Sequence, residues 1–235
     1  MIDAILVPQG VEYKAVCQGL KKIEASSSAN SIPSVFAIPI GVKPLSRYLE
    51  NWLKSGELAN IKQPKVLVMG LCGSLSSKYQ VGDVVVYQNC MYESDEGLAI
   101  AQCDIALTEQ IFNKLNPAVY CVSTLTSDRL IYSASQKRRL GDIYGAEVVD
   151  MEGFAAVNLL TKANIAVAIL RVVSDDCKHN IPNLTSAFSS DGSLKPWPLA
   201  IAMLRNPIGA IRLIYGSLRG LQVLEKISTK ILPQG

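Results

Sequence analysis

The chain has 235 residues, of which 49% are hydrophobic and 18% charged, and its mean hydropathy is +0.23. This composition excludes an intrinsically disordered chain, and the length suits one α/β domain around a single core. The net charge of +3 and the aromatic content of only 6% give no support for a nucleic-acid groove, so we expect no nucleic-acid partner.

Short apolar runs alternate with helical patterns along the chain. The runs are continuous, which is typical of strands that are buried on both faces. They cover 2–7, 34–40, 65–71, 83–88, 118–125 and 165–173. Helical spacing covers 11–23, 43–56, 104–115, 133–141 and 151–163. This alternation predicts a three-layer α/β/α sandwich around a largely parallel sheet, and the serine-rich segment 26–31 is expected to be a surface loop.

We expect no membrane-crossing segment, secretion signal or metal site. The apolar stretches are well short of the roughly 20 residues that a membrane helix needs, and the chain begins directly with a strand-like segment. The cysteines form no Cys-x-x-Cys pair, and His179 is the only histidine. Scattered thiols without metal-ligand spacing indicate a reducing cytoplasm.

Unusual residues follow the predicted strands, where parallel α/β sheets bind their ligands. Glu12 opens the helix after the first strand, although the helix dipole alone would explain a carboxylate there. Gly70 and Gly73, in VLVMGLCGSL, allow the backbone to approach a ligand closely. The segment is neither a Walker loop nor a GxGxxG fingerprint, so neither kind of nucleotide site is predicted.

Two further strand ends carry acids. The segment VDMEG at 149–153 begins a helix and includes Glu152, and carboxylates at a helix start are commonly caps. The segment RVVSDD at 171–176 ends a strand and includes Asp175, which suits either proton transfer or the capping of a turn. Each motif alone allows both interpretations.

Together, these motifs resemble the family of nucleoside phosphorylases and nucleosidases, which includes purine nucleoside phosphorylase and methylthioadenosine/S-adenosylhomocysteine nucleosidase. The matching motifs are the glycines at 70–73, VGDVVV at 81–86, Met151-Glu152, and Arg171 with Ser174-Asp175. The resemblance covers nearly all of 1–190 and implies a catalytic domain there, with a mixed sheet that curls into a distorted barrel. Residues 191–235 are then a basic amphipathic helical extension of the same domain.

The resemblance implies a role for each matching side chain. Asp175 delivers a proton to N7 of the leaving purine, which requires a raised pKa. Glu152 holds the ribose hydroxyls, and its charge favours the oxocarbenium-like transition state. Met151 packs on the sugar, while Arg171 and Ser174 are expected to orient the aspartate.

The base pocket is predicted from the segment TSDRLIYS at 126–133. Leu130 and Ile131 are its expected walls, unless these two side chains only pack in the core. The remaining substrate-binding residues are expected in the glycine segment: Leu71, Cys72 and Gly73.

Two nucleophiles fit the resemblance. Hydrolases of the family use a glutamate of the first loop as the base for water, and Glu12 matches it. Phosphorylases surround phosphate with cations and amides. Leu71 and Val68 stand where the family often has serine and arginine, which weakens both assignments. We expect the nucleophile to be phosphate, which would be a co-substrate, and we expect no cofactor. The candidate phosphate ligands are Lys14, Lys43, Arg47 and Arg129.

The tail carries the positive charge, because residues 191–235 hold six Lys or Arg and two acids. It resembles the C-terminal extension of hopanoid-associated phosphorylases, which remove adenine from an adenosylated triterpene lipid. At 100° per residue, one stripe of the tail holds Arg212, Arg219, Lys226 and Lys230. The opposite side holds Leu213, Ile214, Leu218, Leu221, Leu224 and Ile231. Such a segment, over 198–232, either lies on an anionic membrane surface or docks on the core or on another subunit.

The sequence therefore predicts an enzyme that cleaves the N-glycosidic bond of an adenosine-like purine nucleoside, as a phosphorylase of a lipid-linked substrate such as adenosylhopane. One alternative is a nucleosidase of the methylthioadenosine/S-adenosylhomocysteine type that uses Glu12 and water. Another is a non-catalytic nucleoside-binding protein on the same fold. We expect a homo-oligomer in the cytoplasm, either free or peripheral to the inner face of the membrane.

Overall fold

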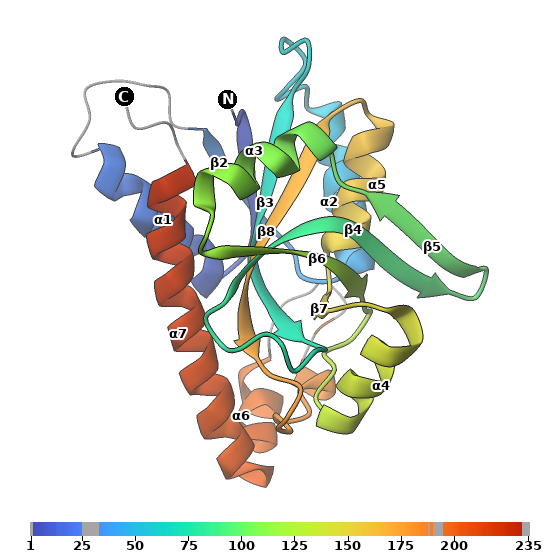
Figure 1. The fold of residues 1–235 in the computed structure, drawn as a ribbon, viewed down its shortest axis with the longest axis vertical. Coiled ribbons are helices and arrows are strands. Elements are labelled where there is room, and N and C mark those ends of the chain that lie inside the picture. Colours follow the sequence, from blue (N-terminus) through green and yellow to red (C-terminus); the bar gives the residue numbers. More distant parts are fainter. Residues whose placement is uncertain (1, 25–32, 188, 190–194, 232–235) are drawn as a thin grey trace.

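The computed structural model describes residues 2–24, 33–187, 189 and 195–231 (Figure 1). The predicted loop at 26–31 lies outside these residues. The strands are β1 (Ala4–Pro8), β2 (Ser34–Ile38), β3 (Lys65–Ser74), β4 (Val84–Ser94), β5 (Gly97–Gln102), β6 (Val119–Thr126), β7 (Val148–Asp150) and β8 (Ala166–Asp175). The α-helices are α1 (Val11–Glu24), α2 (Val42–Lys54), α3 (Ile105–Leu115), α4 (Ala134–Tyr144), α5 (Gly153–Lys162), α6 (Pro196–Arg205) and α7 (Pro207–Ile231).

The sheet is mixed and closes on itself in part. Its strand order is β2-β1-β3-β7-β6-β4-β5, and β8 pairs with both β3 and β4. The strands β3, β8, β4, β6 and β7 therefore form a closed ring, in which β3–β7 and β4–β8 are the antiparallel pairs. A closed ring leaves no free edge among these strands. The predicted fold class, a largely parallel sheet that curls into a barrel, is confirmed.

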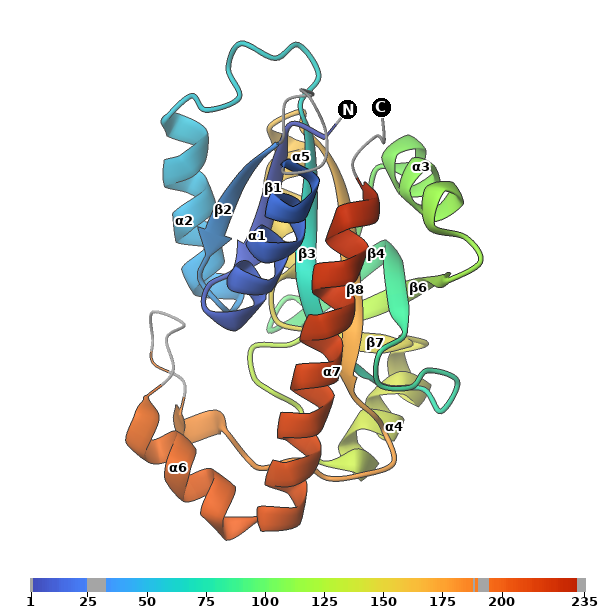
Figure 2. The same ribbon diagram turned by 90° about the vertical axis from the view of Figure 1, so that its left-hand side faces the viewer.

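Helices cover both faces of the sheet, which explains the continuous apolar runs. Along β1, the side chains of Ala4 and Leu6 pack in a cluster with α2 and α5, whereas Ile5 and Val7 pack in a second cluster with α1, α3 and α7. Successive strand residues point to opposite faces, so both sets must be apolar. Figures 1 and 2 show the helices on the two sides of the sheet.

Two features of the sheet differ from the prediction. The segment 97–102 forms β5, which pairs antiparallel with an extended β4, and its residues are largely exposed. An exposed edge strand lacks the continuous apolar signal that the prediction relied on. The strand predicted at 65–71 extends to Ser74, so Gly73 lies within β3 and not after it. A Cβ at Gly70 would lie 2.1 Å from Arg171 Nη1, so glycine is needed there for side-chain packing.

The tail forms two helices, and the halves of α7 differ. Its C-terminal half packs on the core through Leu224 and Ile231, and α1 approaches it so closely that a Cβ at Gly19 would lie 2.0 Å from Ser228 Oγ. Its N-terminal half extends beyond the sheet together with α6 (Figure 2). There Ile214 and Leu218 are exposed, so in this half the predicted apolar side is not buried against the core. The buried line of this half consists instead of small residues, Gly209, Ala210, Gly216 and Gly220.

Within the described part of the chain, none of the helices combines the length and apolar character that a membrane crossing requires.

Candidate active site

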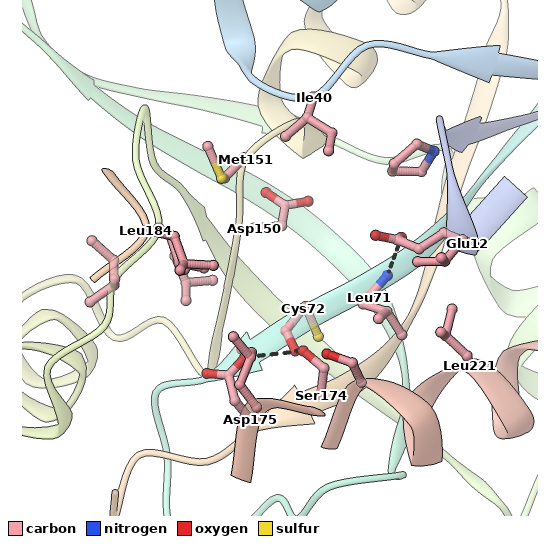
Figure 3. A pocket seen from close by; sticks show the side chains of 18 of the residues that line it. Glu12, Ile40, Leu71, Cys72, Asp150, Met151, Ser174, Asp175, Leu184 and Leu221 are labelled. Carbon is pink, nitrogen blue, oxygen red and sulfur yellow. Dashed lines mark hydrogen bonds between the residues drawn. The ribbon is translucent and has the colours of Figure 1, made fainter. Parts of the chain in front are cut away.

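A single cavity of about 530 Å³ lies at the carboxyl ends of the barrel strands. It lies between the ends of β1, β3, β7 and β8 on one side and the helices α6 and α7 on the other, and Figure 3 shows ten of its lining side chains by name. Its lining includes Glu12, Leu71, Cys72, Gly73, Arg129, Leu130, Ile131, Asp150, Met151, Glu152, Ser174 and Asp175. Three acids that are distant in sequence, Glu12, Glu152 and Asp175, therefore face one hollow.

Glu12 is held at one end of the cavity. Its Oε2 accepts a hydrogen bond from the N–H of Leu71 at 2.8 Å (Figure 3). Burial raises the pKa of Glu12 to about 7, although the nearby positive charge of Arg171 opposes the rise. A carboxyl group that titrates near neutral pH can act as a general base at physiological pH.

Glu152 does not cap the helix that follows it. Its Oε1 accepts from the N–H of Gly41 at 3.0 Å, and its Oε2 accepts from Arg171 Nη2 at 3.2 Å. The cap of α5 comes from Asp150, whose Oδ2 accepts from the N–H of Gly153 at 3.0 Å. Burial raises the pKa of Glu152. The capping interpretation of the motif thus applies to Asp150, and the Glu152 side chain is left facing the cavity.

Arg171 lies behind the cavity and binds its acids. Its side chain is wholly buried, with Nη2 at 3.2 Å from Glu152 Oε2 and 3.4 Å from Asp150 Oδ2, and Nη1 at 4.0 Å from Glu12 Oε2. The prediction that Arg171 orients Asp175 is wrong. The contacts of Asp175 go instead to Ser174 and Lys137. The register of β8 against β3 shifts between Val173 and Asp175, so regular alternation along the strand does not relate the side chains of Arg171 and Asp175.

Asp175 and Glu12 lie at opposite ends of the cavity, with Leu71 and Cys72 between them (Figure 3). Asp175 Oδ1 accepts from Ser174 Oγ at 3.0 Å. Its Oδ2 accepts from the ammonium of Lys137, a residue that the sequence analysis did not single out. The turn after β8 is capped by Asp176, whose Oδ1 accepts from the N–H groups of Lys178 and His179.

The walls between the acids are apolar. Leu130 and Ile131 line the cavity together with Leu184, which the sequence did not indicate. Met151 lies at the rim opposite the glycine segment (Figure 3). Burial raises the pKa of Cys72 to about 12, so this sulfur is a neutral thiol at physiological pH and not a nucleophilic thiolate.

The predicted phosphate ligands are not gathered at the acids. Lys14, Lys43 and Arg47 are exposed and do not line the cavity. Arg129 does line it, from the segment that follows β6. Among the residues that the structure describes, no group of three or more His, Cys, Asp or Glu side chains is placed to hold a metal ion.

A partly closed barrel with an acidic cavity at its strand ends defines the class of protein as an α/β enzyme of the nucleoside phosphorylase type. Residues 57–189 match the phosphorylase superfamily. Since this match spans more than half of the sequence, the chain belongs to that superfamily, and the predicted family and enzyme class are confirmed. No curated protein matches the sequence.

Solved structures share the fold over nearly the whole chain. A putative 5′-methylthioadenosine/S-adenosylhomocysteine nucleosidase from Borrelia burgdorferi, bound to adenine, has a TM-score of 0.68 at 14% identity, with 98% of each chain covered. Futalosine hydrolase of Helicobacter pylori has a TM-score of 0.65 at 14% identity, covering 97% of this chain and 95% of its own. The 5′-methylthioadenosine/S-adenosylhomocysteine nucleosidase of the same organism has a TM-score of 0.63 at 15% identity, covering 95% of this chain and 94% of its own.

Proposed function

We propose that this protein hydrolyses the N-glycosidic bond of an adenosine-like purine nucleoside. The observation that carries the proposal is the placement of Glu12, Glu152 and Asp175 around one cavity. In this arrangement the purine lies beside Asp175 and the ribose between the two glutamates. The superfamily membership supports this chemistry, and so does the adenine bound by the Borrelia burgdorferi relative.

The charges around the cavity suit the transition state of this reaction. As the glycosidic bond stretches, positive charge grows on the sugar and negative charge on the base. Glu152 accepts hydrogen bonds from vicinal ribose hydroxyls, and its carboxylate, with that of Asp150 behind it, favours the cationic sugar. Arg171 contacts both carboxylates, and its positive charge opposes the rise that burial causes in the pKa of Glu152. Asp175, at the other end, protonates the leaving base.

The nucleophile that the charges favour is water. Glu12, with a pKa of about 7, is a suitable acceptor for a water proton, and Arg171 Nη1 faces the same carboxylate. A phosphate dianion at that end would meet Glu12 and Glu152, while Lys14 and Lys43 are exposed and do not line the cavity. Repulsion between like charges in a partly buried site disfavours such a complex. Our proposal therefore prefers the hydrolase to the phosphorylase that the sequence suggested.

Release of adenine with and without phosphate tests this choice. We expect the purified protein to release adenine from methylthioadenosine or adenosine at full rate in phosphate-free buffer, with free ribose or its 5′-substituted form as the second product. Liquid chromatography of the base and the sugar measures both. Strict dependence on phosphate, with a ribose 1-phosphate as product, would establish the phosphorylase instead.

The cavity also supports a substrate with a large apolar 5′ group. Beyond Glu12 and Glu152, its wall is formed by side chains of the two tail helices: Leu199, Met203, Leu213, Ile214, Leu218 and Leu221. A bare 5′ hydroxyl would leave this surface without an apolar partner, whereas a hydrocarbon group gains about 25 cal/mol per Å² that it buries. A lipid-linked nucleoside such as adenosylhopane is one substrate of this chemistry.

The outer side of the same two helices suits an anionic lipid surface. Trp197, Leu204, Ile208, Ile211 and Tyr215 are each at least 65% exposed, and together they are called the hairpin surface. Arg205 and Arg212 are exposed among them, and the sequence has no acid between Asp191 and Glu225. Two copies of so basic a surface would repel each other, so a symmetric contact between subunits is disfavoured. We propose that the hairpin surface lies on anionic membranes.

Vesicle binding tests the membrane proposal. The fluorescence of Trp197 should shift to the blue with vesicles of phosphatidylcholine and phosphatidylglycerol, and much less with phosphatidylcholine alone, because the other tryptophan, Trp52, is already buried. Changing Leu204 and Ile208 to Ser should weaken binding at least tenfold, since each buried aliphatic side chain contributes about 1.5–3 kcal/mol. Ile105→Ser, at an exposed position of α3, is the control. If the double substitution instead turns an oligomer into monomers, the hairpin surface is a subunit interface.

A further inference from the structure

Lys137 is a charged side chain buried beside the cavity. It lies in the second turn of α4, its side chain has no exposed surface, and its Nζ binds Asp175 Oδ2. The same Nζ donates to the carbonyl oxygen of Asp176 at 3.0 Å. Lys137 does not line the cavity, whereas Asp175 does. The amine can therefore reach a bound substrate only through the aspartate.

The fold fixes α4 against the end of β8 by contacts that do not need this lysine. Arg138 Nη1 donates to the carbonyl oxygen of Cys177 at 2.7 Å, and the N–H of Ala134 donates to Asn180 Oδ1 at 2.8 Å. A buried ammonium carries a large desolvation penalty, and an apolar side chain of similar size would pack there at less cost. Attachment of α4 alone thus does not explain a lysine at this position.

The surroundings of the amine bring its proton close to transfer. Burial lowers the pKa of Lys137 to about 8, while the charge of Asp176 opposes the change. The titratable groups around Nζ are Asp175, Asp176, Cys72 and Cys177. An amine with such a pKa is protonated at neutral pH, yet it gives up its proton to a neighbouring acceptor more readily than an ordinary lysine does.

We propose that Lys137 is the positioning residue of Asp175 and the source of the proton that Asp175 passes to the leaving purine. The proposal rests on the proposed function, since it needs a base that leaves with a proton. It separates two tasks in the site. Asp175 contacts the substrate, and Lys137, out of reach of the substrate, holds the carboxylate and supplies it with a proton.

The groups in the site account for every proton of the reaction. Before reaction, Lys137 is an ammonium and Asp175 a carboxylate. As the bond between C1′ and the base breaks, its electron pair goes to the purine. The ammonium passes its proton to Oδ2 of Asp175, and the resulting carboxyl group passes that proton on to N7 and becomes a carboxylate again. Water adds to C1′ and gives its proton to Glu12. The purine leaves neutral, Lys137 is left as an amine and Glu12 as an acid, and solvent then restores both.

Substrates with different leaving groups test the proposal. With adenosine, we expect Lys137→Met to lower kcat by about 10²–10⁴-fold, the usual size of acid catalysis, with a small change in KM. With p-nitrophenyl β-D-ribofuranoside, whose phenolate leaves without a proton, we expect less than about threefold loss, because only acid catalysis has been removed. Arg138→Met, on the same helix, should leave both rates unchanged. Thermal unfolding of each variant measures whether the fold is intact.

The outcomes separate the proposal from its alternatives. Equal losses on both substrates would show that Lys137 only maintains the structure, and no loss on adenosine would remove it from the reaction. The variant Lys137→Arg provides a second test, which needs only adenosine as the substrate. A guanidinium keeps the ion pair but retains its proton, so kcat should fall while KM stays near the wild-type value. Full kcat in this variant would overturn the proton transfer. If the wild-type protein cleaves neither riboside, the proposed function itself fails.

Discussion

Replacing Asp175 by Asn is expected to lower the rate of adenine release by about 10²–10⁴-fold, because the amide cannot donate an acidic proton to N7. The amide has nearly the same shape as the carboxyl group, so the cavity keeps its form. The hydrogen bond from Ser174 Oγ and the contact with Lys137 both go to oxygen atoms of Asp175, and the amide oxygen can accept only one of them. Single-turnover release of adenine, followed by liquid chromatography, measures the effect.

Asp142→Asn is the control for this substitution. Asp142 lies at an exposed position of α4 and does not line the cavity. We therefore expect its replacement to change the rate by less than about threefold, as is usual for an exposed side chain outside the site. A rate for Asp175→Asn within threefold of the wild type would remove the acid role and, with it, the proton path from Lys137.

Glu12→Gln should be the second strongly impaired variant. A glutamine keeps a side-chain oxygen for the N–H of Leu71 but cannot take a proton from water, so we expect hydrolysis to fall by about 10²–10⁴-fold. Glu50→Gln, at an exposed position of α2, is the control. In phosphate buffer, an unchanged rate for Glu12→Gln would indicate a reaction that does not use water.

The pH dependence gives Glu12 a signature of its own. Its pKa of about 7 predicts that the wild-type rate falls as the pH drops through neutrality, since the protonated carboxyl is not a base. A folded-state pKa above the usual value also means that the folded protein binds this proton more tightly than the unfolded chain. Stability should therefore increase as the pH falls from 8 towards 5, and Glu12→Gln should lose that part of the increase. Urea unfolding at both pH values measures the difference.

The strand framework and the placement of the three acids could be predicted from the sequence. Strands buried on both faces leave a continuous apolar signal, as in Ile5 and Leu6, and parallel strands bring their carboxyl ends together. Glu12 follows β1 and Asp175 ends β8, both of which give this signal, whereas Glu152 follows β7, a strand of three residues that lies outside the predicted apolar runs. The sequence pattern that marks each acid is therefore local, and the parallel arrangement of the strands brings the three side chains to one cavity.

Other parts of the site depend on packing that no local pattern records. Lys137 lies in the run Lys137, Arg138, Arg139, which resembles a solvated helix face, and only the approach of β8 buries the first of the three. The partners of Arg171 follow from which face of β8 it occupies and from the ring of strands around it. The split of α7 into a packed half and a protruding half depends on where the sheet ends, which the helix sequence does not contain.

The cavity combines residues inside and outside the segment that matches the superfamily. The matched segment 57–189 contains Glu152, Asp175 and Lys137, whereas Glu12 lies before it and the apolar wall from α6 and α7 lies after it. Substitutions in that wall can alter which 5′ group is accepted without disturbing the residues that break the bond. Members of the superfamily can thus share the reaction while they differ in substrate. Membership alone would identify the reaction but not the substrate.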